Sequence, residues 1–182
     1  HDPIFAGVER TYVPILLGGD KWIEQERHRW ARLFKVPLYD GLPTGFPPTT
    51  VAIMRAACAI THLHPGRAGQ EQLGKALDSL YKAYWVDNRP TQDKQVLAEV
   101  LSQALGQDEA QKVMAAVPKE GKELLIKNTD SAIADGAFGL PWFVVTNEEG
   151  KTEGFWGVDH LGQVIEFLGL EHPKTGGWRS QL

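Results

Sequence analysis

The chain is short of three features that would each point to a definite class of protein. Its 182 residues contain a single cysteine, Cys58, which excludes an internal disulfide, a Cys-x-x-Cys redox pair and a thiolate cage for a metal in this sequence. No run of about 18 apolar residues occurs, so a membrane span is not expected. The 19 basic residues are outnumbered by 23 acidic ones, for a net charge of −4. Because the basic residues form no stripe, nucleic acid is not expected as a partner.

What the chain does contain is the composition of a packed protein. Apolar residues make up 42% and charged residues 23% of the sequence, close to the average of globular domains. The length suits one domain with a helical insertion better than two full domains. The sequence begins at His1-Asp2-Pro3 with neither a methionine nor a signal peptide, which we interpret as the middle of a longer element.

The apolar pattern of the first half predicts one strand followed by helices. A β-rich run over 11–17 predicts a buried strand that ends at Gly18-Gly19, with Pro14 at a sheet edge or bulge. Asp20 is expected to begin a helix that ends before Val36-Pro37, and the Pro/Gly-rich stretch 39–48 is expected to be a loop. Apolar residues at helical spacing predict five further helices, over 51–61, 73–85, 96–104, 113–117 (after an Asp108 cap) and 124–133.

After Gly136 the pattern changes from helical to extended. Residues 141–146 and 153–157 predict two strands joined by a turn at 147–150, and residues 159–168 predict a closing helix. This order is typical of a βαβ fold with a helical domain inserted before its final hairpin and helix. The predicted organisation is an N-terminal part over 1–19, a helical insertion over 20–134, a hairpin–helix part over 135–170 and an irregular tail over 171–182.

Two positions near the predicted hairpin carry chemistry. Pro141 directly before a strand suggests a cis peptide bond with Leu140, which would turn the Leu140 N–H and C=O away from the sheet. Those groups could then pair with a peptide-like ligand, whereas the alternative is an ordinary strand-entry proline. Asp159 lies at a strand-to-helix junction, where a carboxylate can cap the first turn and still accept hydrogen bonds from a ligand.

Other reactive or aromatic side chains favour structural roles. Cys58 lies on an apolar helix face, where a lone thiol usually packs. His62 and His64 are two residues apart, so they face different sides of a helix and predict no metal site. Trp30 and Trp85 are expected in the core, while Trp142 follows Pro141 and is the favoured pocket residue.

The segments that flank the hairpin resemble a known family. Gly136-Ala137-Phe138-Gly139-Leu140-Pro141 and Phe155-Trp156-Gly157-Val158-Asp159-His160 resemble motifs of the kappa-class glutathione transferases and of the related 2-hydroxychromene-2-carboxylate isomerases. The resemblance extends to 12–19 and 34–37 and so covers most of the chain, in a form that looks fungal rather than animal. It implies an α/β, thioredoxin-like (DsbA-like) fold with an all-helical insertion domain.

The resemblance also implies a ligand and its contacts. Glutathione would be the co-substrate, without a metal, and its cysteinyl unit would bind the backbone of Leu140 while Pro141 holds the geometry. Asp159 would take the γ-glutamyl ammonium, beside Val158, which stands where the family has a serine. His160 stands where the family has an arginine. Trp142 would face the second substrate, a small apolar electrophile.

One half of the family's site has no counterpart in the sequence. Nothing before Thr11 matches the family's Ser-Pro-Tyr-like turn, whose serine stabilises the glutathione thiolate, and Gly19 is followed directly by Asp20 where the family has a longer loop. No catalytic residue is therefore assigned. Three hypotheses stay open: a kappa-type transferase, a glutathione-dependent isomerase, and a non-catalytic binding or scaffold protein that kept the fold.

The resemblance carries two further expectations. It implies a homodimer. It also implies a mitochondrial or peroxisomal location, with the cytoplasm as an alternative. The final residues Ser180-Gln181-Leu182 resemble a peroxisomal Ser-Lys-Leu signal in which the basic residue is lost.

Overall fold

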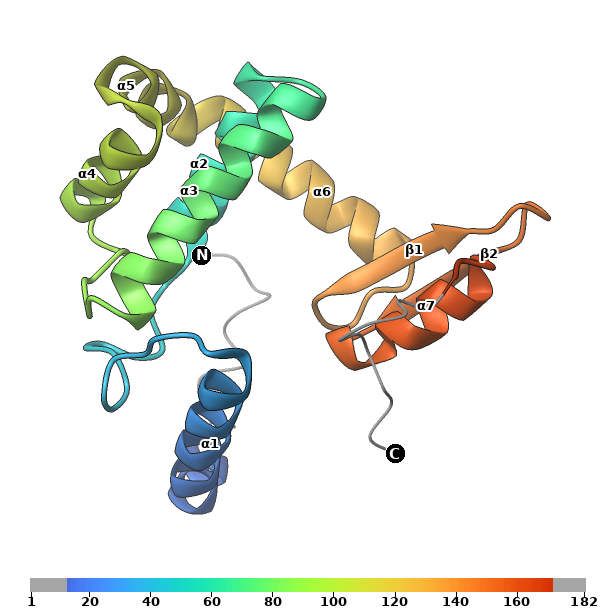
Figure 1. The fold of residues 1–182 in the computed structure, drawn as a ribbon. Helices are drawn as coiled ribbons and strands as arrows, with labels where there is room; N and C mark the ends of the chain where they lie inside the picture. Colours follow the sequence, from blue (N-terminus) through green and yellow to red (C-terminus); the bar gives the residue numbers. More distant parts are fainter. Residues whose placement is uncertain (1–12, 172–182) are drawn as a thin grey trace. The chain divides into compact units, whose positions relative to one another are not determined.

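A computed structural model of the chain describes residues 13–171 (Figure 1). The first two residues of the predicted strand over 11–17, the final Ser180-Gln181-Leu182 and most of the predicted tail lie outside the described residues. The chain divides into two compact units, residues 1–122 and 123–182. The domain borders expected from the sequence, at 19/20 and 134/135, stay a prediction.

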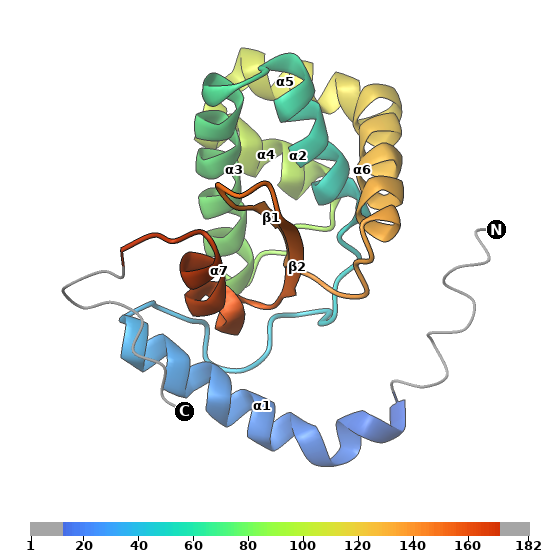
Figure 2. The same cartoon turned by 90° about the vertical axis from the view of Figure 1, so that its right-hand side faces the viewer.

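The first unit is helical. It contains α1 (Val13–Phe34), α2 (Val51–Leu63), α3 (Arg67–Trp85), α4 (Lys94–Leu105), α5 (Gln107–Ala116) and a π-helical turn, η1 (Val117–Gly121). Figure 2 shows α2 to α5 packed together. Their shared core consists of small and branched apolar residues, namely Ala56, Ala59, Ile60, Ala76, Leu80, Ala83, Leu97, Val100, Leu101, Ala110, Val113 and Ala116. The residues at helical spacing in the sequence are thus the ones that close this core.

At two places a glycine lies very close to the backbone of α2 or of its C-terminal cap residue, His64. A Cβ atom on Gly69 would lie 1.7 Å from the His64 carbonyl oxygen, and one on Gly121 would lie 2.3 Å from the Arg55 carbonyl oxygen. Only glycine lets the backbones meet at these places. Helix α4 begins with a side-chain cap, since Asp93 Oδ1 accepts hydrogen bonds from the N–H groups of Gln95 and Val96.

The predicted strand over 11–17 is wrong for the residues that the structure describes. Helix α1 begins at Val13 and runs without a break through Gly18, Gly19 and Asp20, so neither the glycine stop nor the helix start at Asp20 occurs. Within residues 13–171 the sheet has two strands, which pair only with each other. A lone strand would leave its backbone N–H and C=O groups unpaired, whereas a helix pairs them internally.

The remaining helices of the first unit follow the predictions with small changes. Helix α5 begins after Gly106, whose φ of 91° only glycine adopts easily, and not at an Asp108 cap.

The core role predicted for Trp30 is wrong, because its side chain is 54% exposed and stacks on Phe34. Trp85 is half-buried and contacts Phe46.

The second unit contains the hairpin. Helix α6 (Lys122–Ala134) leads into β1 (Trp142–Thr146) and β2 (Thr152–Trp156), which are antiparallel with Trp142 opposite Trp156. A 3-10 turn, η2 (Val158–His160), then continues into α7 (Leu161–Phe167). The predicted hairpin is confirmed, and the predicted closing helix is confirmed from Leu161 onward.

Local contacts explain why this segment folds as a hairpin and a helix. In the turn, Asn147 Oδ1 accepts hydrogen bonds from the N–H groups of Glu149 and Lys151, as asparagine often does in turns. On one face of the hairpin the Phe155 ring meets Phe167 of α7, with centroids 5.7 Å apart. The opposite face carries Trp142 and Trp156, which lie at the end of the hairpin where the candidate site is found.

Candidate functional site

A proline turn lies directly before β1. The Leu140–Pro141 peptide bond is cis, which confirms the expectation from the sequence and rules out an ordinary trans strand-entry proline. Within residues 13–171, neither the N–H nor the C=O of Leu140 forms a hydrogen bond, and the Leu140 side chain is 79% exposed. One donor and one acceptor are therefore open to a ligand at this turn.

A single hydrogen bond joins this turn to the end of β2. The Gly157 N–H donates to the Pro141 carbonyl oxygen, with an N···O distance of 3.0 Å. It continues the hairpin beyond the Trp142–Trp156 pair. As a result, the residues that follow Gly157 begin beside the proline turn, and the two sequence motifs meet in space.

Gly157 is required for the shape of this junction. Its φ is 92°, a value that side chains disfavour, and a Cβ atom on it would lie 2.3 Å from Asp159 Oδ1. The Asp159 carboxylate thus folds back over Gly157. The Asp159 side chain is 78% exposed, so a ligand can reach it.

The structure does not support the helix cap predicted for Asp159. Neither η2 nor α7 has a side-chain cap hydrogen bond, and the residue before η2 is Gly157. Among the described residues, the ionisable side chain that lies beside the carboxylate is the imidazole of His160, with Nδ1 3.5 Å from Oδ2. An acidic side chain that caps nothing and faces solvent is available for binding.

Aromatic side chains line the hairpin beside the turn. The Phe138 ring lies 5.1 Å from Trp156 and 5.7 Å from Trp142, centroid to centroid. Two glycines make room for these rings, since a Cβ atom on Gly139 would lie 2.5 Å from Trp156 Nε1 and one on Gly154 would lie 2.3 Å from Trp142 Cζ2.

This aromatic surface is open to solvent at its edge. Phe138 is 75% exposed and Val158 is 58% exposed, while Trp142 is half-buried. Sequence reasoning singled out Trp142 but assigned no role to Phe138 or Trp156. The signal that could have found them was the strand register, because residues directly opposite in a hairpin share one face.

The other predicted candidates lie in the first unit. Cys58 is buried in α2, which confirms its packing role. His64 Nε2 lies 2.5 Å from Glu109 Oε1, so its partner is a carboxylate. Among residues 13–171, no three His, Cys, Asp or Glu side chains gather in a way that could hold a metal ion.

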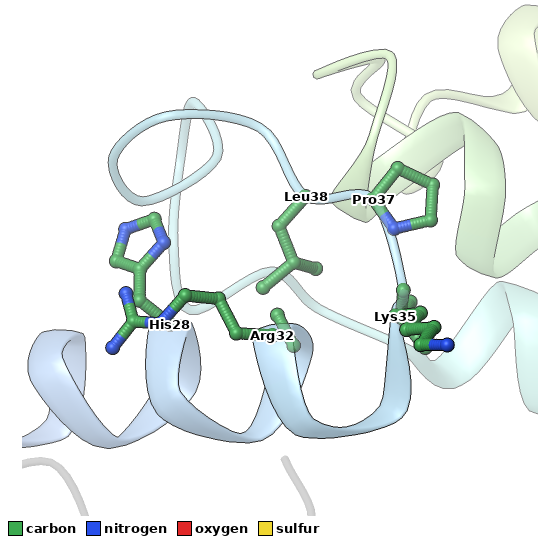
Figure 3. A pocket seen from close by; sticks show the side chains of 7 residues that line it. His28, Arg32, Lys35, Pro37 and Leu38 are labelled. Atoms are coloured by element: carbon green, nitrogen blue, oxygen red, sulfur yellow. The ribbon is translucent and has the colours of Figure 1, made fainter.

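An open pocket of about 440 Å³ lies at the C-terminal end of α1. Its lining includes the imidazole of His28 and the cationic side chains of Arg32 and Lys35, and Figure 3 shows Arg32 on the side of His28, with Lys35 directed away. Helix α1 ends here in a turn with Lys35 at a φ of 56°, where the Val36 N–H donates to the Ala31 carbonyl oxygen. Cations commonly stabilise a helix C-terminus, so this cluster has a structural explanation.

Comparisons with known proteins agree with this architecture. A family model described as DSBA-like thioredoxin domain matches residues 10–169. The chain belongs to this family. Its α/β, DsbA-like fold with a helical insertion, expected from the sequence, is thereby confirmed. In the described part of the chain, no helix combines the length and apolar character needed to span a bilayer.

Two individual proteins refine the comparison. "Glutathione s-transferase kappa 2" of Caenorhabditis elegans is 37% identical over 103 residues, which are 56% of this chain and 45% of that relative, so the match spans less than half of the relative's length. The cytosolic disulfide reductase DsbM from Pseudomonas aeruginosa has a TM-score of 0.55 at 21% identity, over 84% of this chain and 74% of that one. The second likeness concerns the fold alone. The expected fungal branch stays a prediction.

Proposed function

We propose that this protein binds glutathione at the Leu140–Pro141 turn and at Asp159, and that it serves a glutathione transferase reaction of the kappa type. The observation that carries the proposal is the hydrogen bond from Gly157 to Pro141. It brings the unpaired backbone of Leu140 and the exposed Asp159 carboxylate to the same end of the hairpin. The similarity to a kappa-class transferase supports glutathione as the ligand.

The two binding groups suit two parts of the tripeptide. The Leu140 N–H and C=O can pair with the backbone of the cysteinyl unit in the way that two antiparallel strands pair. The Asp159 carboxylate can receive the γ-glutamyl ammonium in a charge-assisted hydrogen bond. Val158, which precedes Asp159 in the chain, offers an exposed apolar side chain. Holding both ends of the γ-glutamyl-cysteine portion fixes the position of the sulfur.

In the proposed reaction the glutathione thiolate attacks an electrophilic carbon. A C–S bond forms, the leaving group departs with the electron pair of its bond, and the thiol proton goes to solvent. Trp142, with Phe138 and Trp156, provides an apolar surface for a small aromatic electrophile. These residues bind and orient the reactants, and none of them is assigned the task of holding the sulfur as a thiolate.

The test separates binding from turnover. Titration calorimetry with glutathione should show that Asp159→Asn weakens binding about tenfold or more, because a charge-assisted hydrogen bond is lost. Asp135→Asn is the matched control, since Asp135 is an exposed carboxylate in the same unit. Equal binding by all three proteins would remove Asp159 from the site.

Turnover then distinguishes the transferase from the other two hypotheses. Conjugation of 1-chloro-2,4-dinitrobenzene above the uncatalysed rate would support the transferase. Glutathione binding without conjugation would leave the isomerase and the non-catalytic alternative, of which the valine at position 158 favours the second.

A further inference from the structure

The backbone segment before Pro141 has few hydrogen bonds of its own. Among the described residues, the nearest backbone hydrogen bonds lie at Ala137, whose N–H bonds back to α6, and at Pro141, whose carbonyl oxygen accepts from Gly157. Residues 138–140 between them form no backbone hydrogen bond within this part of the chain. The position of Leu140 therefore depends on side-chain packing and not on a hydrogen-bonded ladder.

The indole of Trp156 lies directly against the middle of this segment. A Cβ atom on Gly139 would lie 2.5 Å from Nε1, 2.9 Å from Cε2 and 3.3 Å from Cδ1 of that indole, so its five-membered ring covers the side-chain position of Gly139. The φ of Gly139 is not positive, so its backbone conformation does not by itself call for glycine. Glycine is needed here because the ring lies so close to the backbone.

The Trp156 ring has a fixed place of its own in the hairpin. Trp156 belongs to β2, where it pairs with Trp142 of β1. The Phe138 ring lies against it with centroids 5.1 Å apart, and also meets Trp142 edge-on at 5.7 Å, an arrangement that aromatic pairs prefer. The segment before Pro141 is thus attached to the hairpin through aromatic contacts where it has no hydrogen bonds.

We propose that Trp156 is a positioning residue, which holds Gly139 against the hairpin and so fixes the N–H and C=O of Leu140 for a peptide-like ligand. This inference rests on the proposed function, which assigns glutathione to the Leu140 backbone. A backbone segment that is ordered before binding loses little conformational entropy when the ligand arrives. Trp156 needs no contact with glutathione for this role, because it acts through Gly139.

The first test measures glutathione binding by the full chain without any electrophile, so a contact between Trp156 and a second substrate cannot contribute. Titration calorimetry should show that Trp156→Ala weakens binding about five- to tenfold, because the ligand then has to order residues 138–140. Trp156→Phe keeps an aromatic ring beside Gly139 and should restore most of the affinity. Trp30→Ala is the matched control, since Trp30 is an exposed tryptophan of the first unit, and it should bind as wild type does. Equal binding by wild type and Trp156→Ala would overturn the proposal.

A double substitution separates positioning from a direct contact with the ligand. Gly139→Ala alone should weaken glutathione binding, because its methyl group would meet the Trp156 indole and displace the segment. In the Trp156→Ala background the ring is gone, so adding Gly139→Ala should cause no further loss of affinity. Losses that simply add would show that Trp156 does not act through Gly139, and would overturn the proposal.

A measurement without ligand keeps the proposal separate from the proposed function. The NMR order parameter of the Leu140 amide should fall from about 0.85 to below about 0.6 in Trp156→Ala, while that of Val144, in the middle of β1, keeps its wild-type value. Gly139→Ala is the second variant in case Trp156→Ala fails to fold, and the same fall is expected at Leu140. An unchanged order parameter at Leu140 would overturn the positioning role. If the order parameter falls but glutathione does not bind even to wild type, the positioning role stands and the proposed function fails.

Discussion

The two units of the chain bury their apolar residues very differently. The helices of the first unit enclose a continuous core, in which Leu97, Leu101 and Val113 have no exposed surface. In the second unit, among residues 123–171, Val164 of α7 is the one apolar residue that is buried, and Phe138, Leu140, Trp156 and Val158 are exposed. We therefore expect the first unit to contribute most of the stability, because a closed apolar core stabilises a fold. The second unit is better suited to binding, because its exposed apolar surface lies beside polar groups that a ligand can reach.

The largest expected effect comes from opening the core of the first unit. Leu97→Ala should lower the free energy of unfolding by about 2–5 kcal/mol, since it removes fully buried carbon atoms and leaves a cavity. Urea denaturation followed by circular dichroism measures the change. Ile126→Ala is the control, because that side chain is 51% exposed and its loss should cost less than about 0.5 kcal/mol. If both variants lost a similar free energy of unfolding, the first unit would not hold the more tightly packed core.

A pair of glycines tests the junction at the candidate site. Gly157→Ala should destabilise the protein by about 1–3 kcal/mol, because a side chain at φ 92° is strained and would meet Asp159 Oδ1. Gly162→Ala in α7, where nothing lies within 4 Å of the added atom, should instead stabilise by about 0.5–1 kcal/mol. In thermal melts, the melting temperature should fall for Gly157→Ala and rise for Gly162→Ala. A change in the same direction for both variants would argue against the described junction.

An ion pair in the first unit gives a pH-dependent effect of medium size. The hydrogen bond from His64 lowers the pKa of the Glu109 carboxyl, with a smaller opposing effect of burial. A lowered pKa in the folded state means that the stabilisation is present above the carboxyl's unfolded pKa and is lost as the pH falls through the folded one. Glu109→Gln should therefore cost about 1 kcal/mol at pH 7 and almost nothing in strong acid.

The control for this variant lies on another helix of the first unit. Asp78 is exposed on α3 and has no ion pair within the described residues. Asp78→Asn should change the free energy of unfolding by less than about 0.5 kcal/mol at either pH. A loss for Glu109→Gln that persists in acid would show that the ionised carboxylate is not what stabilises the pair.

The smallest expected effect on stability belongs to the residue expected to matter most for binding. Asp159 caps no helix and its carboxylate is largely exposed, so Asp159→Asn should change the free energy of unfolding by less than about 0.5 kcal/mol. The same variant is expected to weaken glutathione binding about tenfold or more. A large fall in the melting temperature would mean that Asp159 is a structural residue.

Local chemistry explains which elements could be predicted. The helices over 51–134 follow from apolar residues at helical spacing, and the hairpin follows from Asn147 and Gly150 between two β-rich runs. The cis bond before Pro141 was also predictable, because it depends on one residue and its place before a strand. The run over 11–17 was not, since a short apolar run suits a strand or a buried helix equally well.

The sequence by itself determined the family, the helical block, the hairpin and the two motifs that flank it, because these depend on local spacing and on residue type. Only the tertiary structure decided that Asp159 faces solvent instead of capping a helix, that Trp30 lies outside the core, and that Phe138 and Trp156 join Trp142 on one surface. These outcomes depend on backbone angles and on strand register. The φ of 92° at Gly157 and its hydrogen bond to Pro141 bring together residues that are far apart along the chain, which no local pattern specifies.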